Sequence, residues 1–161
     1  MSQSVETTPV CRFCGATLTT SFANLGATPL ANRYLTTPEQ ADPRYPLHAR
    51  VCDACLLVQV ETVVPAEDIF SDYAYFSSFS TTWVAHAEAY TKMVTERFSL
   101  NAESSVIEVA SNDGYLLQHF IKAGIPVLGI EPAINVAETA NANGVPTLPE
   151  FFCLELAQTL R

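Results

Sequence analysis

The segment Ser105-Val-Ile-Glu-Val-Ala-Ser-Asn-Asp-Gly-Tyr-Leu-Leu117 gives the clearest indication of how this chain folds. Its short apolar run consists of Val106, Ile107, Val109 and Ala110 and has the length of a buried parallel strand. Small and turn-forming residues follow at 111–114, where the backbone can bend tightly and approach a ligand. Helical spacing resumes from Tyr115. Strand, polar loop and helix in this order predict the first part of a nucleotide-binding βαβ unit.

A second strand is predicted at Pro126-Val-Leu-Gly-Ile-Glu131, and it ends on a carboxylate. An acid about twenty residues beyond such a loop can reach the hydroxyls of a ribose, so we interpret this region as a cofactor half-site. A weak third strand is expected at 145–148 and a helix at 151–160. Because a doubly wound sheet usually has about five strands or more, we expect the N-terminal fragment of a longer enzyme. A small two-part protein that ends at Arg161 is the alternative.

Two C-x-x-C pairs, Cys11-Arg-Phe-Cys14 and Cys52-Asp-Ala-Cys55, lie in the N-terminal part of the chain. Together they supply four thiolates, which is the ligand set that a tetrahedral structural zinc prefers. We therefore predict that Zn²⁺ is bound by Cys11, Cys14, Cys52 and Cys55. The role would be structural, because four protein thiolates leave no open position for water or substrate. Two disulfides or a redox-active C-x-x-C are the alternatives.

The sequence divides at Pro65-Ala-Glu-Asp-Ile-Phe70, which has the composition of a linker with a short helical turn. We expect an α/β protein with a small zinc-binding domain at residues 1–66 and an incomplete, Rossmann-like methyltransferase-type sheet at residues 67–161. Strands are predicted to enter and leave the second cysteine pair at 45–51 and 56–60.

A long amphipathic helix is expected at residues 81–100, with Ser80 or Thr81 as its cap. Its apolar residues recur at helical spacing and are predicted to face the sheet: Trp83, Ala87, Tyr90, Val94 and Phe98.

The three histidines and the fifth cysteine receive no role in chemistry. His48 is expected to be a strand or surface residue, and His86 a solvated or core-edge residue. His119 falls on the polar side of its helix beside Gln118 and Lys122 and is expected to be solvated. Cys153 is expected to face the core from a helix.

Composition limits the classes of function. Of 161 residues, 48% are hydrophobic and 16% charged, which is typical of a globular chain. The formal net charge of −9 argues against nucleic acids and anionic membrane surfaces as partners. No apolar run approaches the roughly eighteen residues of a transmembrane helix, and the N-terminus lacks the pattern of a secretory signal. A cytoplasmic protein is expected.

Written as Glu108-x-Ala110-x-Asn112-x-Gly114, the loop resembles the E/D-x-G-x-G-x-G signature of class I S-adenosylmethionine-dependent methyltransferases, with two glycines replaced. The longer string from 107 to 117, followed by Gly129-Ile-Glu-Pro-Ala133, is similar to a narrower group. These are the sugar C-methyltransferases, which modify nucleotide-linked keto-deoxysugars and carry a zinc-binding N-terminal domain. In that group, alanine and asparagine at the positions of Ala110 and Asn112 are expected in place of glycine. The resemblance extends from about Cys11 to the end of the chain.

The resemblance implies S-adenosylmethionine as methyl donor and a nucleotide (dTDP)-linked keto-deoxysugar as substrate, in deoxysugar and antibiotic biosynthesis. A carbon next to the ketone would be methylated through an enolate. Glu131 is expected to bind the ribose hydroxyls, Glu108 to orient the loop or hold the donor's ammonium through water, and Pro132 to flank the adenine. The full set of expected donor contacts is Tyr73, Ser77, Glu108, Ala110, Ser111, Asn112, Asp113, Gly114, Glu131 and Pro132.

The stretch Tyr73-Ala-Tyr-Phe-Ser-Ser-Phe-Ser80 is dense in aromatic and hydroxyl groups. It is either a packed loop that joins the domains or a cover over the cofactor, where a phenol contacts the sulfonium at a gain of roughly 0.5–2 kcal/mol. The resemblance favours the cover. Tyr73 is the first candidate for a catalytic role, with Tyr75 and Ser77 next. The main base is expected beyond Arg161, so this chain alone is expected to bind and not to catalyse.

Two other functions fit parts of the sequence. An NAD-dependent oxidoreductase would use the same strand, loop and acid, but the loop lacks Gly-x-Gly, and Asn112 would crowd a pyrophosphate. A non-enzymatic zinc-ribbon interaction module is the third interpretation. The sequence does not indicate an oligomeric state.

Overall fold

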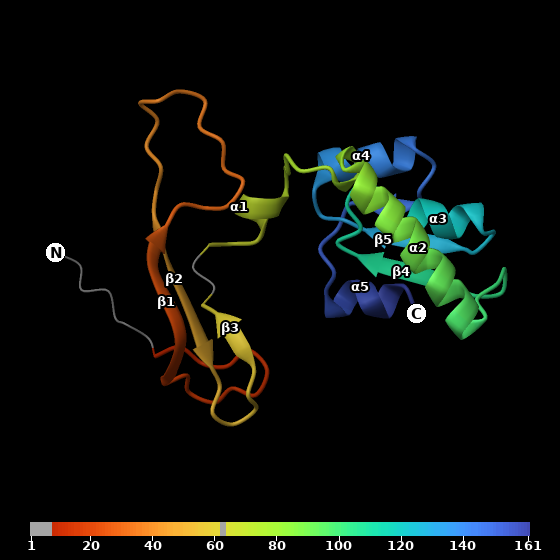
Figure 1. Ribbon diagram of the computed structural model, residues 1–161. Coiled ribbons are helices and arrows are strands. Elements are labelled where there is room, and N and C mark those ends of the chain that lie inside the picture. The colour runs from red at the N-terminus through yellow and green to blue at the C-terminus, as the bar shows by residue number, and fades with distance from the viewer. Residues whose placement is uncertain (1–7, 62–63) are drawn as a thin grey trace. The chain divides into compact units, whose positions relative to one another are not determined.

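The computed structural model describes residues 8–61 and 64–161. The chain divides into two compact units, Met1–Pro65 and Ala66–Arg161 (Figure 1). The division lies one residue from the boundary expected from the linker. No helix among the described residues is both long and apolar enough to cross a membrane.

Unit 1 contains a three-stranded antiparallel sheet in the order β1-β2-β3. Strand β1 spans Thr20–Thr28, β2 spans Tyr45–Val51 and β3 spans Val58–Val60. The sequence predicted β2 and β3 because an alternating run enters one side of the second cysteine pair and a second run leaves the other. Strand β1 was not predicted, and its ladder is interrupted by two register shifts. Those shifts break the strict alternation that identifies a strand in sequence.

Unit 2 contains a parallel sheet in the order β4-β5-β6. Strand β4 spans Val106–Val109, β5 spans Val127–Ile130 and β6 spans Thr147–Leu148. Helices α3 (Leu117–Lys122) and α4 (Ile134–Ala142) connect them. This alternation is the predicted βαβ arrangement, and it confirms the expected α/β class.

The helices of unit 2 cover the sheet through one apolar cluster. Helix α3 packs on β4 and β5, and α4 packs on β6. The cluster of buried side chains consists of Leu117, Phe120, Ile125, Ala140 and Val145. The loop begins where β4 ends, and the packing of Leu117 and Phe120 on α3 holds its other end.

Three helical segments precede the parallel sheet in unit 2. A short helix, α1, spans Glu67–Phe70, a 3₁₀ turn, η1, spans Ser77–Phe79, and the long helix α2 spans Thr81–Phe98. Ser80 caps α2 as predicted, since its hydroxyl accepts from the Trp83 backbone N–H at 3.3 Å. Helix α2 packs on α3 and crosses in front of the sheet in the view of Figure 1.

The buried face of α2 agrees with the prediction at Ala87, which is buried, and at Val94, which packs against the apolar cluster, but not at the three aromatic residues. Trp83 and Tyr90 are each 44% exposed and Phe98 is 63% exposed, whereas Ala87 and Thr91 are buried. The prediction gave weight to the aromatic residues, whereas the two buried residues of this helix, Ala87 and Thr91, are small.

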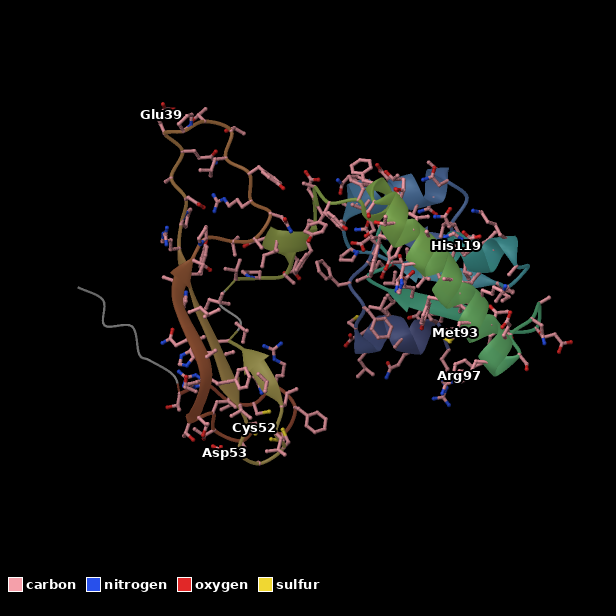
Figure 2. All side chains as sticks on the ribbon, in the orientation of Figure 1. Glu39, Cys52, Asp53, Met93, Arg97 and His119 are labelled. Carbon is pink, nitrogen blue, oxygen red and sulfur yellow. The ribbon has the colours of Figure 1, made fainter. Side chains whose placement is uncertain are left out.

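Two further predictions were wrong. His119 is buried between α2 and α3 rather than solvated (Figure 2). Cys153 is exposed and does not face the core: its sulfur lies 3.5 Å from the Leu156 backbone N–H, at the N-cap of α5 (Leu154–Thr159). The sulfur accepts from the first turn of the helix, as an N-cap side chain does, and this position lies outside the core.

Candidate functional site

The four cysteines of the two C-x-x-C pairs meet in unit 1, with all four sulfurs within 4.8 Å of one another. The Cys11 and Cys55 sulfurs are 3.7 Å apart, and those of Cys14 and Cys52 are 3.5 Å apart. A tetrahedral zinc with Zn–S bonds of about 2.3 Å requires sulfur separations of about 3.8 Å, so the predicted ligand set fits. A disulfide would need about 2.05 Å, and all four thiols are free. Figure 2 shows the sulfur atoms gathered near Cys52 and Asp53.

The two cysteine turns have the same backbone geometry. In the first, the N–H of Cys11 donates to the Ala16 carbonyl and the N–H of Gly15 donates to the Cys11 carbonyl. In the second, Cys52 donates to Leu57 and Leu56 donates to Cys52 in the same positions. The residue after each pair is left-handed, with φ of 75° at Gly15 and 63° at Leu56. A glycine adopts this conformation at no steric cost, and a leucine does not.

Hydrogen bonds support the thiolate form of Cys11. The Cys14 backbone N–H, more than the Gln59 side chain, lowers the pKa of Cys11 to about 6 against the cost of burial. Gln59 donates to the Cys11 sulfur at 3.1 Å and accepts from the Arg12 backbone at 3.0 Å. The Leu57 N–H favours the Cys55 thiolate in the same way, but burial and the neighbouring sulfurs raise the pKa of Cys55 to about 12. Four thiolates this close therefore require a cation.

Histidine does not join this cluster. Within residues 8–61 and 64–161, the four cysteines are the one group of three or more potential ligands that the structure brings together. His48 lies on β2, where its Nε2 is 2.8 Å from the Ser21 hydroxyl. It is a strand residue, as predicted.

In unit 2, the loop after β4 takes an unusual backbone path. Ala110, Asn112 and Gly114 all have positive φ, at 57°, 51° and 80°. These are the three positions that hold glycine in the methyltransferase signature, although two of them carry side chains here. Left-handed backbone is costly for alanine, and asparagine tolerates it better. Two of the three signature positions therefore carry side chains in a backbone conformation that glycine adopts more readily.

Two glycines allow the loop to lie against the sheet. A Cβ at Gly114 would lie 2.7 Å from a Val145 methyl group, and a Cβ at Gly129 would lie 2.5 Å from the Ser111 hydroxyl. Ser111 itself is completely buried. Of the predicted donor contacts, Ser111 thus lies between the loop and Gly129 of the sheet, and its hydroxyl has no hydrogen-bond partner among the described residues.

Glu131 holds the loop from the end of β5. Its carboxylate is 6% exposed and accepts from the Asn112 backbone N–H at 2.9 Å and from the Ala133 backbone N–H at 3.0 Å. A carboxylate has about four acceptor sites, so two sites remain for other donors. The predicted contact with a ribose stays a prediction. The sequence did not indicate the bond to Asn112, because residues far apart in the chain form it.

Glu108 lies on β4 beside this carboxylate. Burial, and then the charge of Glu131, raise the pKa of Glu108 to about 7. One of its oxygens, Oε2, is buried without a partner among the described residues. A carboxyl group in this state can exchange a proton near neutral pH or accept a bond from a ligand.

An aromatic group that the sequence analysis missed borders the loop. The rings of Trp83 and Tyr115 stack with centroids 6.1 Å apart, and Trp83 stacks on His86 at 5.2 Å. Burial, and then the nearby Glu108, raise the pKa of Tyr115. Trp83 was assigned to the core because of its helical spacing. Its position beside the loop depends on the rotation of α2, which spacing alone did not fix.

The aromatic and serine-rich stretch lies against the same loop. The Ser77 backbone N–H donates to Asn112 Oδ1 at 2.8 Å, and Asn112 Nδ2 donates to the Tyr75 carbonyl at 3.1 Å. Asp113 Oδ2 accepts from the Ser78 backbone N–H at 3.1 Å. The side chains of Asn112 and Asp113 are thus engaged with this stretch, and Tyr75, 52% exposed, stands at its surface. Tyr73 is half-buried and Pro132 partly exposed.

A separate cavity of about 330 Å³ lies between α2 and α3. Burial and the nearby Lys122 lower the pKa of His119, which lines it. The cavity shares no residue with the loop after β4. Its lining consists of Glu88, Thr91, Lys92, Thr95, Glu96, His119, Lys122 and Ala123.

Comparison with known proteins gives two matches. A family model titled "Putative zinc binding domain" matches residues 11–70. The chain is 32% identical over 162 aligned positions to the C-methyltransferase NovU of Streptomyces niveus. That alignment covers 99% of this chain and 39% of the relative, so the chain spans less than half of the relative's length. The two matches confirm the resemblance on which the sequence analysis relied.

Proposed function

We propose that residues 105–133 form the methyl-donor half-site of an S-adenosylmethionine-dependent C-methyltransferase, because the chain is similar to a zinc-binding domain family at residues 11–70 and to a C-methyltransferase along nearly its whole length. The observation that carries the proposal is the backbone of the loop after β4. Its three signature positions are all left-handed, although only one is a glycine. A chain under no functional constraint would avoid this conformation at alanine.

The residues at the loop suit the parts of such a donor. The exposed backbone at Ala110 would face the amino-acid part, and the free acceptor sites of Glu131 would take the ribose hydroxyls. Glu108, with a raised pKa and an unpartnered oxygen, would face the donor's ammonium. Pro132 would flank the adenine. The bound donor would supply an electrophilic methyl group on a sulfonium.

The acceptor we propose is a nucleotide-linked keto-deoxysugar that is methylated next to its ketone through an enolate. Tyr73 and Tyr75 would provide phenol groups on the acceptor side of the donor. The bonds from Asn112 and Asp113 that hold this stretch at the loop support the placement. The zinc centre would be structural, because four sulfurs complete its coordination.

Calorimetric titration of the chain with S-adenosylhomocysteine tests the proposal, and a separate titration with NAD serves as the control for the oxidoreductase alternative. We expect saturable binding of S-adenosylhomocysteine and none of NAD. Glu131→Gln should weaken the binding by about tenfold or more, which corresponds to the loss of a charge-assisted hydrogen bond of about 1.5–3 kcal/mol. Glu138→Gln, an exposed acid on α4 with the same change of charge, should bind like the unaltered chain.

Folding of each variant is checked by its far-ultraviolet circular dichroism, since Glu131 also holds the loop backbone. Binding of NAD in place of S-adenosylhomocysteine would replace the proposal by the oxidoreductase alternative. Equal affinity of the folded Glu131→Gln and Glu138→Gln variants would remove Glu131 from the site.

A further inference from the structure

Residues 71–80 of unit 2, which we call the strap, are fastened to the rest of the unit at two places. The first anchor is at the start of α4. The Tyr73 backbone N–H donates to Asn135 Oδ1 at 3.2 Å, and Asn135 Nδ2 donates to the Tyr73 carbonyl at 2.9 Å. The Ile134 N–H also donates to the Ser71 carbonyl at 3.2 Å. One asparagine amide thus satisfies both backbone groups of one strap residue.

The second anchor is the loop after β4, and it uses an asparagine in a similar way. Asn112 accepts from Ser77 and donates to Tyr75, both through the strap backbone. Its neighbour Asp113 accepts from Ser78. Loop and strap are more than thirty residues apart in sequence, with separations of 35 and 37 at these bonds. Among the described residues, Asn112 is the one whose side-chain amide joins the loop to the strap.

Asn112 meets two requirements at one position. Its backbone is left-handed, with φ of 51°, which glycine or asparagine adopts more readily than other residues. Its side chain is almost fully buried, and both its oxygen and its nitrogen bond to the strap. Glycine would meet the first requirement and not the second. The asparagine therefore adds a connection that a glycine at this position of the signature cannot make.

We propose that Asn112 is a positioning residue that couples the strap to the loop, so that a ligand bound on the loop also engages Tyr75 and the rest of the strap. Asn112 does this through the strap backbone, since its amide oxygen accepts from Ser77 and its amide nitrogen donates to Tyr75. The nature of the ligand rests on the proposed function, whereas the coupling itself does not.

Two glycine substitutions in the same loop separate this coupling from loop geometry. Asn112→Gly keeps a backbone that tolerates positive φ and removes the amide. Ala110→Gly is the matched control, because Ala110 is also left-handed, at φ 57°, but no side-chain group is lost there beyond a methyl. Both variants place a glycine where φ is positive, so neither should strain the loop backbone. Only Asn112→Gly removes the bonds that hold the strap.

The first readout is amide hydrogen exchange in the ligand-free chain. The informative amide is Ser78, which bonds to Asp113 and not to Asn112. Coupling predicts that Asn112→Gly lowers the protection of Ser78 by about tenfold or more, because two hydrogen bonds that hold the strap are lost. Amides of β5 report the global stability of unit 2, and their protection should not change in either variant. The protection of Ser78 should also be unchanged in Ala110→Gly. Loss of protection at Ser77 alone would show only the missing acceptor and would overturn the proposal.

The second readout is the affinity for S-adenosylhomocysteine. Asn112→Gly should bind about tenfold more weakly than the unaltered chain, where tenfold corresponds to about 1.4 kcal/mol. Asn143→Gly, the same substitution at an exposed position after α4, should bind within about twofold of the unaltered chain. Equal affinities of the two variants would overturn the role of Asn112 in binding. If the unaltered chain does not bind this probe, the proposed function fails, and the exchange of Ser78 alone decides whether the coupling exists.

Discussion

Unit 1 and unit 2 hold their structures by different means. In unit 1 the buried apolar cluster consists of Cys11, Leu18 and Cys52, and two of the three are metal ligands. In unit 2 the cluster consists of aliphatic and aromatic side chains on α3, α4 and the segments beside them. So small an apolar cluster cannot offset the conformational entropy of an ordered chain. The comparison indicates that unit 1 depends on a cation, whereas unit 2 depends on packing.

The two units also place non-glycine residues in left-handed backbone where their sites lie. Leu56 has this conformation after the second cysteine pair, and Ala110 and Asn112 have it in the loop after β4. In unit 1 the strained residue completes a turn around sulfur ligands. In unit 2 the strained residues present a loop backbone. Strain of this kind persists when the surroundings determine the conformation more strongly than the local preference does.

The largest expected effect comes from removing a zinc ligand. Cys52→Ser should abolish the folded state of unit 1 and leave unit 2 folded, because structural zinc supplies roughly 10–16 kcal/mol of apparent binding free energy at neutral pH. Nuclear magnetic resonance spectra resolve the two units, and metal analysis gives the zinc content. Cys153→Ser is the control, since this exposed cysteine lies outside the cluster. If unit 1 stayed folded without metal, the claim that unit 1 depends on a cation would be wrong.

A packing change in unit 2 should act on that unit alone. Gly114→Ala introduces a Cβ 2.7 Å from Val145 at a φ of 80°, and we expect a loss of about 2–5 kcal/mol of stability. Gly124→Ala shares the positive φ but has open space around it, so it should cost about 1–2 kcal/mol. Denaturant unfolding measures both. Equal losses in the two variants would show that contact with Val145 does not limit the loop.

The raised pKa of Glu108 predicts a dependence of unit 2 stability on pH. Burial raises this pKa from 4.5 to about 7, so the folded state binds more protons than the unfolded state between these values. Stability should therefore fall as pH rises from about 4.5 to 7. Glu108→Gln should remove this fall, and its advantage over the unaltered chain should grow by about 1–2 kcal/mol across the range, after allowance for solvent screening.

Urea unfolding at a series of pH values measures the effect, with Glu138→Gln as an exposed control on α4. A constant difference between Glu108→Gln and the unaltered chain at all pH values would contradict the assignment.

The smallest expected effect concerns the matching turns of unit 1. Leu56→Gly should stabilise the zinc-loaded unit by up to about 1 kcal/mol, because Leu56 is left-handed and its side chain is 75% exposed. Gly15→Ala, at the equivalent position of the first pair, should destabilise by a similar amount. Melting temperatures of the two variants should move in opposite directions. Shifts of the same sign would show that the turns are not equivalent.

The sequence was sufficient for features that depend on local pattern. The cysteine spacing predicted the four-sulfur cluster, and the order of strand, loop and helix predicted β4, α3 and β5. It was insufficient where a contact joins distant segments. The bonds of Asn112 to the strap and of Glu131 to the loop are long-range and leave no periodic signal. The rotation of α2, the burial of His119 and the exposure of Cys153 depended on which neighbours each helix meets.

The most direct test of the difference between the units is residue-resolved hydrogen exchange of the chain under two treatments. We expect that a zinc chelator removes the protection of β2 in unit 1 and leaves that of β5 in unit 2. We also expect that S-adenosylhomocysteine raises protection in the loop after β4 and in the strap, and leaves β2 unchanged. Protection of β2 that survives complete removal of zinc, or a ligand response confined to unit 1, would contradict these expectations.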